Sequence, residues 1–354
     1  MQKIDLPITR YYGSKRKLVK KIWDVFDELD LKFDSVLDVF GGSAIFSYYA
    51  KKMNKSVIYN DIFRFNYLIG KALIENKRTT ITQEQIVNLL SPKTNGIYRQ
   101  IVNCNYKDIY FTDVENKLID IVIQNIEKLE NEFDKASAYY VLFQTCLIKR
   151  PFNIFHRKNL SLRINHVNSN FGNKKTWEKT FEELFIKFHM ELKHFQFDNL
   201  KNNICVNSSA LNCNSTADLV YIDPPYFNEK GTHVSYHSRY HFLEGLSNYD
   251  KLESNISLQK NNKEIIINKI NEFEDRKTFL DDLTRLINKH INSIIAISYR
   301  NNGFPSIDEI ADLLKSQMYG CKVDIIDLGD YSYALNRNNL GKKEYLIIGR
   351  KQSD

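Results

Sequence analysis

The sequence predicts an α/β protein in which one sheet is interrupted by a largely helical insertion. A strand, a glycine turn, a helix and a second strand follow one another over residues 35–61, strand patterns are missing from residues 79–149, and they resume from residue 217. A strand–helix–strand unit places its two strands parallel in one sheet. The 354 residues correspond to about two domains at ~150 residues each.

The sheet is expected to begin near the amino terminus. Residues 15–29 have apolar side chains at helical spacing, and residues 35–40 form a short buried strand. The turn Gly41-Gly42-Ser43 follows, then a helix, then a strand over residues 56–61 that ends in an acid. This is the order of a βαβ unit.

The insertion is predicted to cover residues 79–199, so that residues 1–78 and 200–354 form the domain that contains the sheet. Apolar side chains recur at helical spacing through its first part. Residues 249–271, rich in Asn, Lys and Ile, show no clear pattern.

The sheet is expected to resume with a strand over residues 217–223. A helix and another strand follow, and Ser306 with Glu309 three positions later forms a capping box that starts a further helix. The last two β segments, CKVDIIDLGDY and EYLIIGRK, are expected to pair as antiparallel neighbours.

The composition favours a polyanionic partner. Fifty Lys and Arg residues against 43 Asp and Glu residues give a formal net charge of +7, which favours nucleic acid. No apolar run approaches the ~20 residues of a membrane span, and the amino terminus has no signal core. We therefore expect a cytoplasmic protein with no membrane partner. The five scattered cysteines are typical of reduced thiols.

A short proline motif follows the strand at residues 217–223. Asp223, Pro224, Pro225 and Tyr226 lie at the carboxyl end of that strand, where open α/β sheets bind ligands. The prolines stiffen the turn and leave its carbonyls as acceptors, so a carboxylate and a carbonyl can together accept both hydrogens of an amino group. The tyrosine offers a flat face to a planar base. The alternative is an ordinary proline turn with a core tyrosine.

The turn Phe40-Gly41-Gly42-Ser43 and the acid Asp61 are typical of a nucleotide-like cofactor site. Glycines let the backbone approach a ligand, and a helix amino terminus favours negative charge. Asp61 follows Asp38 at the spacing at which an acid can hold ribose hydroxyls. The full G-x-G-x-x-G fingerprint is missing, which disfavours a dinucleotide. A tight turn without a ligand explains these residues nearly as well.

Two basic segments are candidates for anion binding. Residues 11–17 form a basic loop ahead of the first helix, where a bound anion and a solvated charge cluster are both reasonable interpretations. Residues 151–177 mix basic and aromatic side chains, which suits phosphate contacts and base reading; a solvated loop packed by its aromatics is equally compatible. The basic residues of this second segment are Arg157, Lys158, Arg163, Lys174 and Lys175.

Three histidines recur every four positions after the proline motif. On a helix, His233, His237 and His241 would share one face and could bind a metal. No second cluster completes such a site, so no metal is expected.

In this order, the motifs resemble those of the Dam-like, D12-class adenine-specific DNA methyltransferases in their α arrangement. R-Y-Y-G-S-K-R-K at residues 10–17 resembles the family's first cofactor motif, and residues 40–44 resemble its F-x-G-x-G motif, with Ala44 at the last glycine. Asp61 matches the acid that holds the cofactor ribose, and D-P-P-Y matches the catalytic motif. The segment from FNIFHRKNLSLR to FGNKKTW is similar to a recurrent segment linked to target recognition.

The resemblance implies a Rossmann-like methyltransferase sheet, S-adenosylmethionine as the methyl donor and double-stranded DNA as the substrate. The target adenine would flip onto Tyr226, and its N6 would attack the methyl group while Asp223 and the Pro224 carbonyl accept hydrogen bonds from the amino group. A cognate restriction endonuclease is a further implied partner. The residues implied to bind the donor are Tyr11, Lys15, Phe40, Gly41, Asp61 and Asp223.

Three alternatives stay open on the sequence. The same fold could methylate adenine in RNA or N4 of cytosine in DNA, or the chain could be a non-catalytic nucleic-acid-binding protein that keeps the fold. The basic helical insertion favours a reader of duplex DNA, and the intact Asp223 speaks against loss of catalysis.

Overall fold

A computed structural model describes residues 4–8, 10–78, 80–94, 96–165, 174–228, 234–266, 272–330 and 342–351. The chain divides into two compact units. Unit 1 consists of Met1–Gly70, Asn199–Ser235 and Lys269–Asp354, and unit 2 consists of Lys71–Asp198 and Tyr236–Asn268. In addition to a segment close to the predicted insertion, unit 2 thus contains residues 236–268. The limits of the insertion at residues 79 and 199 stay a prediction from the sequence.

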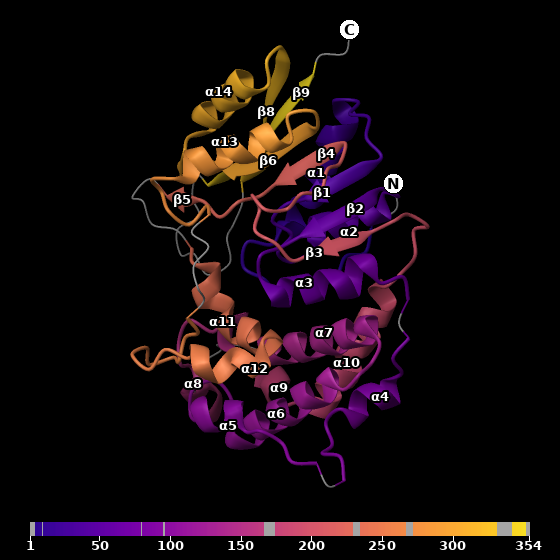
Figure 1. Ribbon diagram of the computed structural model, residues 1–354, viewed down its shortest axis with the longest axis vertical. Helices are drawn as coiled ribbons and strands as arrows, with labels where there is room; N and C mark the ends of the chain where they lie inside the picture. The colour runs from indigo at the N-terminus through magenta and orange to yellow at the C-terminus, as the bar shows by residue number, and fades with distance from the viewer. Residues whose placement is uncertain are drawn as a thin grey trace. The chain divides into compact units, whose positions relative to one another are not determined.

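Unit 1 is built on a seven-stranded sheet with the order β3-β2-β1-β4-β6-β9-β8 (Figure 1). The five strands β3, β2, β1, β4 and β6 pair in parallel, and β9 and β8 add two antiparallel pairings. This confirms the predicted α/β fold and the antiparallel pairing of the last two segments. The strands are β1 Ser35–Asp38, β2 Ser56–Asn60, β3 Ile204–Val206, β4 Leu219–Ile222, β6 Ile294–Arg300, β8 Cys321–Asp330 and β9 Lys343–Lys351.

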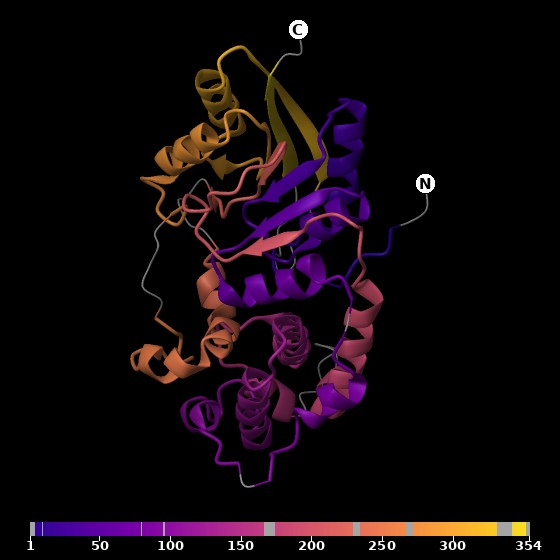
Figure 2. The ribbon, with the colours of Figure 1, turned by 45° about the vertical axis from the view of Figure 1, so that its right-hand side comes forward.

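Helices cover both faces of this sheet, which is why the central strand β4 is apolar and buried along its whole length. α13 and α14 pack on one face, where Leu37, Val220 and Ile297 belong to one buried cluster with their side chains. α1 and α2 lie on the other face, where the ring of Phe46 stacks on Tyr221 at 3.6 Å (Figure 2). The helices of unit 1 are α1 Val19–Glu28, α2 Ile45–Lys52, α3 Arg64–Gly70, α13 Phe279–Lys289 and α14 Ile307–Gln317, with a 3-10 turn η1 at Lys15–Lys17.

The local signals of unit 1 were accurate, with two exceptions. Ser306 caps α14, and Glu309 completes the predicted capping box. The helix expected over residues 15–29 is instead a 3-10 turn followed by α1. β3 was not predicted, because its three apolar residues are flanked by asparagines and are shorter than the runs of four to eight residues that indicate a buried strand.

A short ribbon lies at the end of the proline motif. β5 (Phe227–Asn228) pairs antiparallel with β7 (Gly303–Phe304). The Tyr299 hydroxyl donates to the Phe304 carbonyl at 2.6 Å. The chain after β4 is therefore tied to the chain after β6.

Unit 2 is helical in the part that the structure describes, apart from one isolated bridge between Ile256 and Ile265. α7 is buried along most of its length, and α4, α6 and α10 each begin with a capping box. Its α-helices are α4 Gln83–Asn88, α5 Ile101–Asn105, α6 Asp113–Glu127, α7 Glu132–Ile148, α8 Leu160–Ile164, α9 Lys174–Trp177, α10 Phe181–Phe195, α11 Tyr236–Ser247 and α12 Tyr249–Leu252. The shorter elements are the π-helix η2 Lys71–Glu75 and the 3-10 turns η3 Pro151–Asn153 and η4 Glu253–Asn255.

The segment without a clear sequence pattern, residues 249–271, contains α12 and η4 and belongs to unit 2 as far as Asn268. Residues 267–271 lie outside the described part. Within the described residues, no helix is both long and apolar enough to cross a membrane.

Candidate active site

The D-P-P-Y motif lies at the carboxyl end of β4, beside a buried lysine. The ammonium of Lys15 is 2.9 Å from Oδ1 of Asp223 and 3.5 Å from Oε2 of Glu344. Lys15 is 4% exposed, whereas Asp223 is 19% exposed and so remains accessible. An ion pair therefore joins the amino-terminal basic loop to the proline motif, although more than 200 residues separate them in the sequence.

Burial and ion pairing act in opposite directions in this cluster. Burial raises the pKa of Asp223, and the neighbouring Lys15 charge offsets part of that rise. Burial would lower the pKa of Lys15, but the charges of Asp223 and Glu344 outweigh it, and the pKa is raised well above its ordinary value. Lys15 is thus a permanent cation near neutral pH and favours the ionised, accepting form of Asp223.

The ring of Tyr226 is held from several sides. Its hydroxyl donates to Oε1 of Glu344 at 3.2 Å, and the ring of Tyr299 meets it edge-on at 5.2 Å. The guanidinium of Arg300 lies 5.0 Å from the ring centroid, and the Lys15 ammonium lies 5.7 Å from it. A ring fixed in this way is a preformed stacking surface.

The glycine turn after β1 is shaped by two tyrosines. A Cβ at Gly41 would lie 2.1 Å from the Tyr59 ring, so the ring fills the space of the missing side chain. Gly42 has a φ of +47°, and a Cβ there would lie 3.3 Å from the ring of Tyr11. Ala44 has a φ of 60°, the left-handed conformation that a glycine adopts more freely. The departure from the F-x-G-x-G pattern therefore keeps the backbone path of a glycine.

Two further carboxyl groups lie at the carboxyl ends of β1 and β2. Oδ2 of Asp61 accepts from the Gly42 N–H at 2.8 Å, and Oδ1 accepts from the Phe63 N–H at 2.8 Å. Burial raises the pKa of Asp61 to about 6, against the effect of these hydrogen bonds. Asp38 accepts from the Ser47 hydroxyl at 2.7 Å, and burial with the nearby carboxylates raises its pKa to about 7.

The structure brings the predicted cofactor residues to one edge of the sheet, at the carboxyl ends of β1, β2 and β4. Phe40 is half-buried and its ring meets Phe273 edge-on at 5.1 Å. The Tyr11 hydroxyl accepts from Nδ2 of Asn66 at 3.3 Å. The role of each residue toward a cofactor stays a proposal.

The basic segment of unit 2 exposes only some of its predicted DNA contacts. Arg157, Lys158 and Lys175 are exposed. Lys174 begins α9, but its side chain lies outside the described residues. The aromatic Phe155 is buried rather than displayed.

Arg163 is engaged within the protein. Its guanidinium makes two hydrogen bonds to Glu115, at 3.1 and 2.8 Å, and is 7% exposed. Lys149 lies 2.8 Å from the same carboxylate. Because its two terminal nitrogens are directed at Glu115, we assign Arg163 a structural role and leave it out of the proposed DNA contacts.

A buried arginine that no sequence pattern indicated supports this segment. Arg150 is 1% exposed, and it donates to the carbonyls of Arg157 at 2.7 Å, Tyr110 at 3.3 Å and Ile154 at 3.3 Å. Its guanidinium also lies 4.6 Å from the Tyr110 ring centroid. Arg150 therefore fixes the backbone from which the exposed basic side chains project.

The histidines after the proline motif have other partners. Nε2 of His241 lies 2.9 Å from the Tyr110 hydroxyl, and its Nδ1 accepts from the Ile265 N–H at 3.3 Å. Nε2 of His237 lies 2.6 Å from the Ile265 carbonyl. His233 lies outside the described residues. Within the described part of the chain, no group of three or more His, Cys, Asp or Glu side chains is arranged to hold a metal ion.

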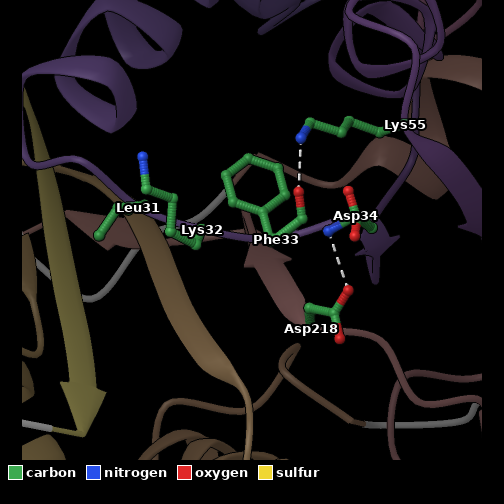
Figure 3. A pocket seen from close by; sticks show the side chains of 6 residues that line it. All are labelled: Leu31, Lys32, Phe33, Asp34, Lys55 and Asp218. Atoms are coloured by element: carbon green, nitrogen blue, oxygen red, sulfur yellow. Dashed lines mark hydrogen bonds between the residues drawn. The ribbon is translucent and has the colours of Figure 1, made fainter. Parts of the chain in front are cut away.

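A surface cavity lies at the opposite edge of the sheet, next to the amino ends of β1 and β4 (Figure 3). Oδ2 of Asp218 accepts from the N–H groups of Asp34 and Ser35, both at 2.9 Å. Lys55 donates to the Phe33 carbonyl. These polar groups satisfy one another, and ligands of open α/β sheets bind at the carboxyl edge, so this cavity has no place in the candidate site.

A seven-stranded sheet of this order with D-P-P-Y at the end of β4 defines a methyltransferase-like site. The family model of the D12 class N6 adenine-specific DNA methyltransferases matches residues 11–275. The chain belongs to this family. It is therefore an enzyme that uses a methyl donor to methylate N6 of adenine in DNA.

Several modification enzymes are similar to the chain. The type II methyltransferase M2.HphI of Haemophilus parahaemolyticus is 26% identical over 351 residues, which cover 97% of each chain. The modification methylase StsI of Streptococcus sanguinis is 27% identical over 96% of this chain and 51% of its own length. The modification methylase LlaI of Lactococcus lactis subsp. lactis is 26% identical over 96% of this chain and 54% of its own length. The chain thus spans nearly all of the first relative and about half of the other two.

Proposed function

We propose that this enzyme transfers the methyl group of S-adenosylmethionine to N6 of an adenine that is flipped out of double-stranded DNA. The observation that supports this most directly is the placement of Asp223 at the carboxyl end of β4, paired with Lys15 and next to the fixed ring of Tyr226. The glycine turn and Asp61 lie at the ends of the neighbouring strands β1 and β2.

The residues at this edge fit the proposed donor. Each oxygen of Asp61 accepts one backbone hydrogen bond, and the Asn66 side chain donates a further one to the same carboxylate. One lone pair of the carboxylate is thus left that can accept from a ribose hydroxyl. Asp38, Asp61 and Asp223 lie at the carboxyl ends of adjacent strands, and the negative charge of the ionised groups among them suits a cationic sulfonium. Tyr11, Phe40 and the Gly41–Gly42 backbone would border the donor beside them.

The chemistry needs no covalent intermediate with the protein. When bound, S-adenosylmethionine supplies an electrophilic methyl group. Asp223 and the Pro224 carbonyl would accept hydrogen bonds from the two N–H groups of the adenine amino group and turn its lone pair toward that methyl group. As the C–N bond forms, the C–S bond breaks to leave S-adenosylhomocysteine, and the methylated amino group loses one proton. Tyr226 would stack on the flipped base, whose unstacking costs a few kcal/mol. Alignment and fixed charges then lower the barrier.

We propose DNA contacts by Arg157, Lys158, Lys174 and Lys175, and a role in restriction-modification beside a cognate endonuclease. Exposure of three of these side chains supports the first proposal. The names of the relatives, a type II methyltransferase and modification methylases, support the second.

One experiment tests the reaction. The purified protein is incubated with methyl-labelled S-adenosylmethionine and unmethylated duplex DNA, and the labelled nucleoside is identified after digestion. We expect N6-methyladenine from the wild type and a loss of at least about 10²-fold in Asp223→Ala. Asp312→Ala, which removes an exposed aspartate of α14, serves as the control and should keep full activity.

The other outcomes would contradict the proposal in different ways. Label on N4 of cytosine would change the target base, and label on RNA alone would change the substrate. A wild-type protein that does not bind S-adenosylmethionine would overturn the donor assignment. Equal activity of Asp223→Ala and wild type would overturn the assignment of the motif.

A further inference from the structure

Glu344 lies behind the proline motif, on a strand that joins the sheet late in the chain. It is the second residue of β9 and pairs with Arg300 across the antiparallel β6–β9 ladder. β6 in turn lies beside β4, which ends at Ile222, directly before Asp223. The side chain of Glu344 is completely buried.

The two oxygens of this carboxylate contact two different parts of the candidate site. Oε1 accepts from the Tyr226 hydroxyl at 3.2 Å. Oε2 lies 3.5 Å from the Lys15 ammonium, which itself is 2.9 Å from Asp223. Glu344 therefore touches a neighbour of the catalytic acid and the stacking tyrosine at the same time.

Stability alone does not explain a carboxylate in this position. A buried ion pair costs desolvation that its Coulomb attraction often fails to recover, and an apolar side chain of similar size is commonly as stable. Lys15 already has one carboxylate partner in Asp223. The second carboxylate therefore serves to fix the positions of the Lys15 ammonium and the Tyr226 hydroxyl.

We propose that Glu344 is a positioning residue for methyl transfer, which holds Lys15 against Asp223 and orients the ring of Tyr226. This inference rests on the proposed function, in which Asp223 and Tyr226 contact the target adenine. Arg300, the cross-strand partner of Glu344, lies over the same ring, so β6 and β9 together support the motif on β4.

Steady-state methylation by the full chain tests this role. Glu344→Gln keeps the shape and loses the charge, and Glu344→Ala loses both. We expect kcat to fall about 10-fold in the first and about 10²-fold in the second, with KM for S-adenosylmethionine and for DNA within about 3-fold of wild type. Glu309→Gln, the same change at an exposed cap of α14, should leave both constants unchanged.

A double-mutant cycle separates positioning from a general loss of structure. Tyr226→Phe keeps the ring and removes the hydroxyl that Glu344 accepts from. If Glu344 acts through Tyr226, the fold-decrease of kcat in the double variant Glu344→Gln/Tyr226→Phe is clearly smaller than the product of the fold-decreases in the two single variants. The proposal would be overturned if the loss of kcat in the double variant equals the product of the two single losses. It would also be overturned if kcat of Glu344→Gln stays within 2-fold of wild type, or if both KM values rise as much as kcat falls.

A readout without catalysis separates this inference from the proposed function. In protein with ¹³Cε-labelled lysine, the Lys15 resonance is assigned by its loss in Lys15→Met. We expect it to shift in Glu344→Gln and not in Glu309→Gln. An inactive wild type with a Lys15 shift would overturn the proposed reaction and leave the Glu344 contact standing, whereas an unmoved resonance would overturn the contact.

Discussion

Asp38 has a carboxyl group whose pKa the fold raises strongly. It is 1% exposed, and burial, with the charges of Asp223 and Asp61, raises its pKa to about 7 although Ser47 donates to it. A carboxyl group whose pKa is higher in the folded than in the unfolded protein stabilises the fold while protonated. That contribution is complete below the unfolded value near 4 and is lost as the pH rises to about 7.

We therefore expect Asp38→Asn to change the pH dependence of stability. Between pH 4 and pH 7 the free energy of unfolding of the wild type should fall by up to ~1.4 kcal/mol per pH unit through this group. The amide removes this dependence. The free energy of unfolding of the variant, relative to that of the wild type, should therefore increase by a few kcal/mol between pH 5 and pH 8. Denaturant unfolding at several pH values measures this, and a difference that does not change with pH would contradict it.

Gly41 illustrates a residue whose type is set by packing. Gly41→Ala places a Cβ 2.1 Å from the Tyr59 ring, and we expect a loss of about 3 kcal/mol or more because the ring is fully buried and cannot move freely. Gly320→Ala is the control: its φ of +71° carries strain, but nothing lies within 4 Å of the new Cβ, so a loss of only ~1–2 kcal/mol is expected. Thermal unfolding of both variants compares them. Equal losses would show that backbone strain, and not the ring, decides.

At the scale of the element, α6 and α8 depend on one carboxylate. Glu115 completes the capping box of α6 through Thr112 and also binds Arg163 of α8 and Lys149 at the end of α7. Burial would raise the pKa of Glu115, but these cations outweigh it and the pKa is lowered. The stabilisation by Glu115 is thus present at pH values above its pKa in the unfolded protein. It is lost as the pH falls through its lower pKa in the folded protein.

We expect Glu115→Gln to destabilise the protein by about 3–5 kcal/mol, because it leaves two buried cations without a counter-charge. Glu183→Gln is a matched control, since Glu183 occupies the same capping-box position in α10 and no ion pair involving it occurs among the described residues. Because Glu183 is fully exposed, its replacement should cost far less than that of Glu115. Unfolding by denaturant measures both free energies. Similar losses in the two variants would contradict a special role of the Arg163–Glu115 pair.

At the scale of the whole molecule, the net charge of +7 predicts DNA binding that weakens with salt. The logarithm of the binding constant falls with the logarithm of the salt concentration, by about 0.9 for each phosphate neutralised. The exposed side chains of Arg157 and Lys158 are two of the proposed contacts in unit 2, and the buried Arg150 donates to the Arg157 carbonyl and holds their backbone.

We expect Arg157→Gln/Lys158→Gln to reduce this salt slope by about 2 and to weaken binding similarly for all DNA sequences. Lys117→Gln/Lys193→Gln removes the same charge from two other exposed sites of unit 2 and should change the slope by less than about 0.5. Fluorescence anisotropy with labelled duplex DNA at several salt concentrations provides both slopes. Equal slopes for the two double variants would show a general charge effect and no local contact.

The sequence alone predicted the features that depend on neighbouring residues. The βαβ order, the turn at Gly41, the capping box at Ser306 and the proline motif at the end of a strand are all local patterns, and the structure confirms their elements. These features can be predicted because hydrophobic periodicity, turn residues and helix caps each depend on residues only a few positions apart. The family resemblance rested on the same short motifs, and the family match bears it out.

Only the tertiary structure decided which distant side chains meet. Glu344 appeared in the sequence as a polar residue at the start of a strand, and its contact with Lys15 follows from the addition of β9 beside β6. The pairing of Arg163 with Glu115, 48 positions earlier, also cannot be predicted from the sequence, because it depends on the packing of α6 and α8. Charge pairs and buried hydrogen bonds depend on distances of a few ångströms between segments far apart along the chain, and those distances are fixed by the packing of the whole unit.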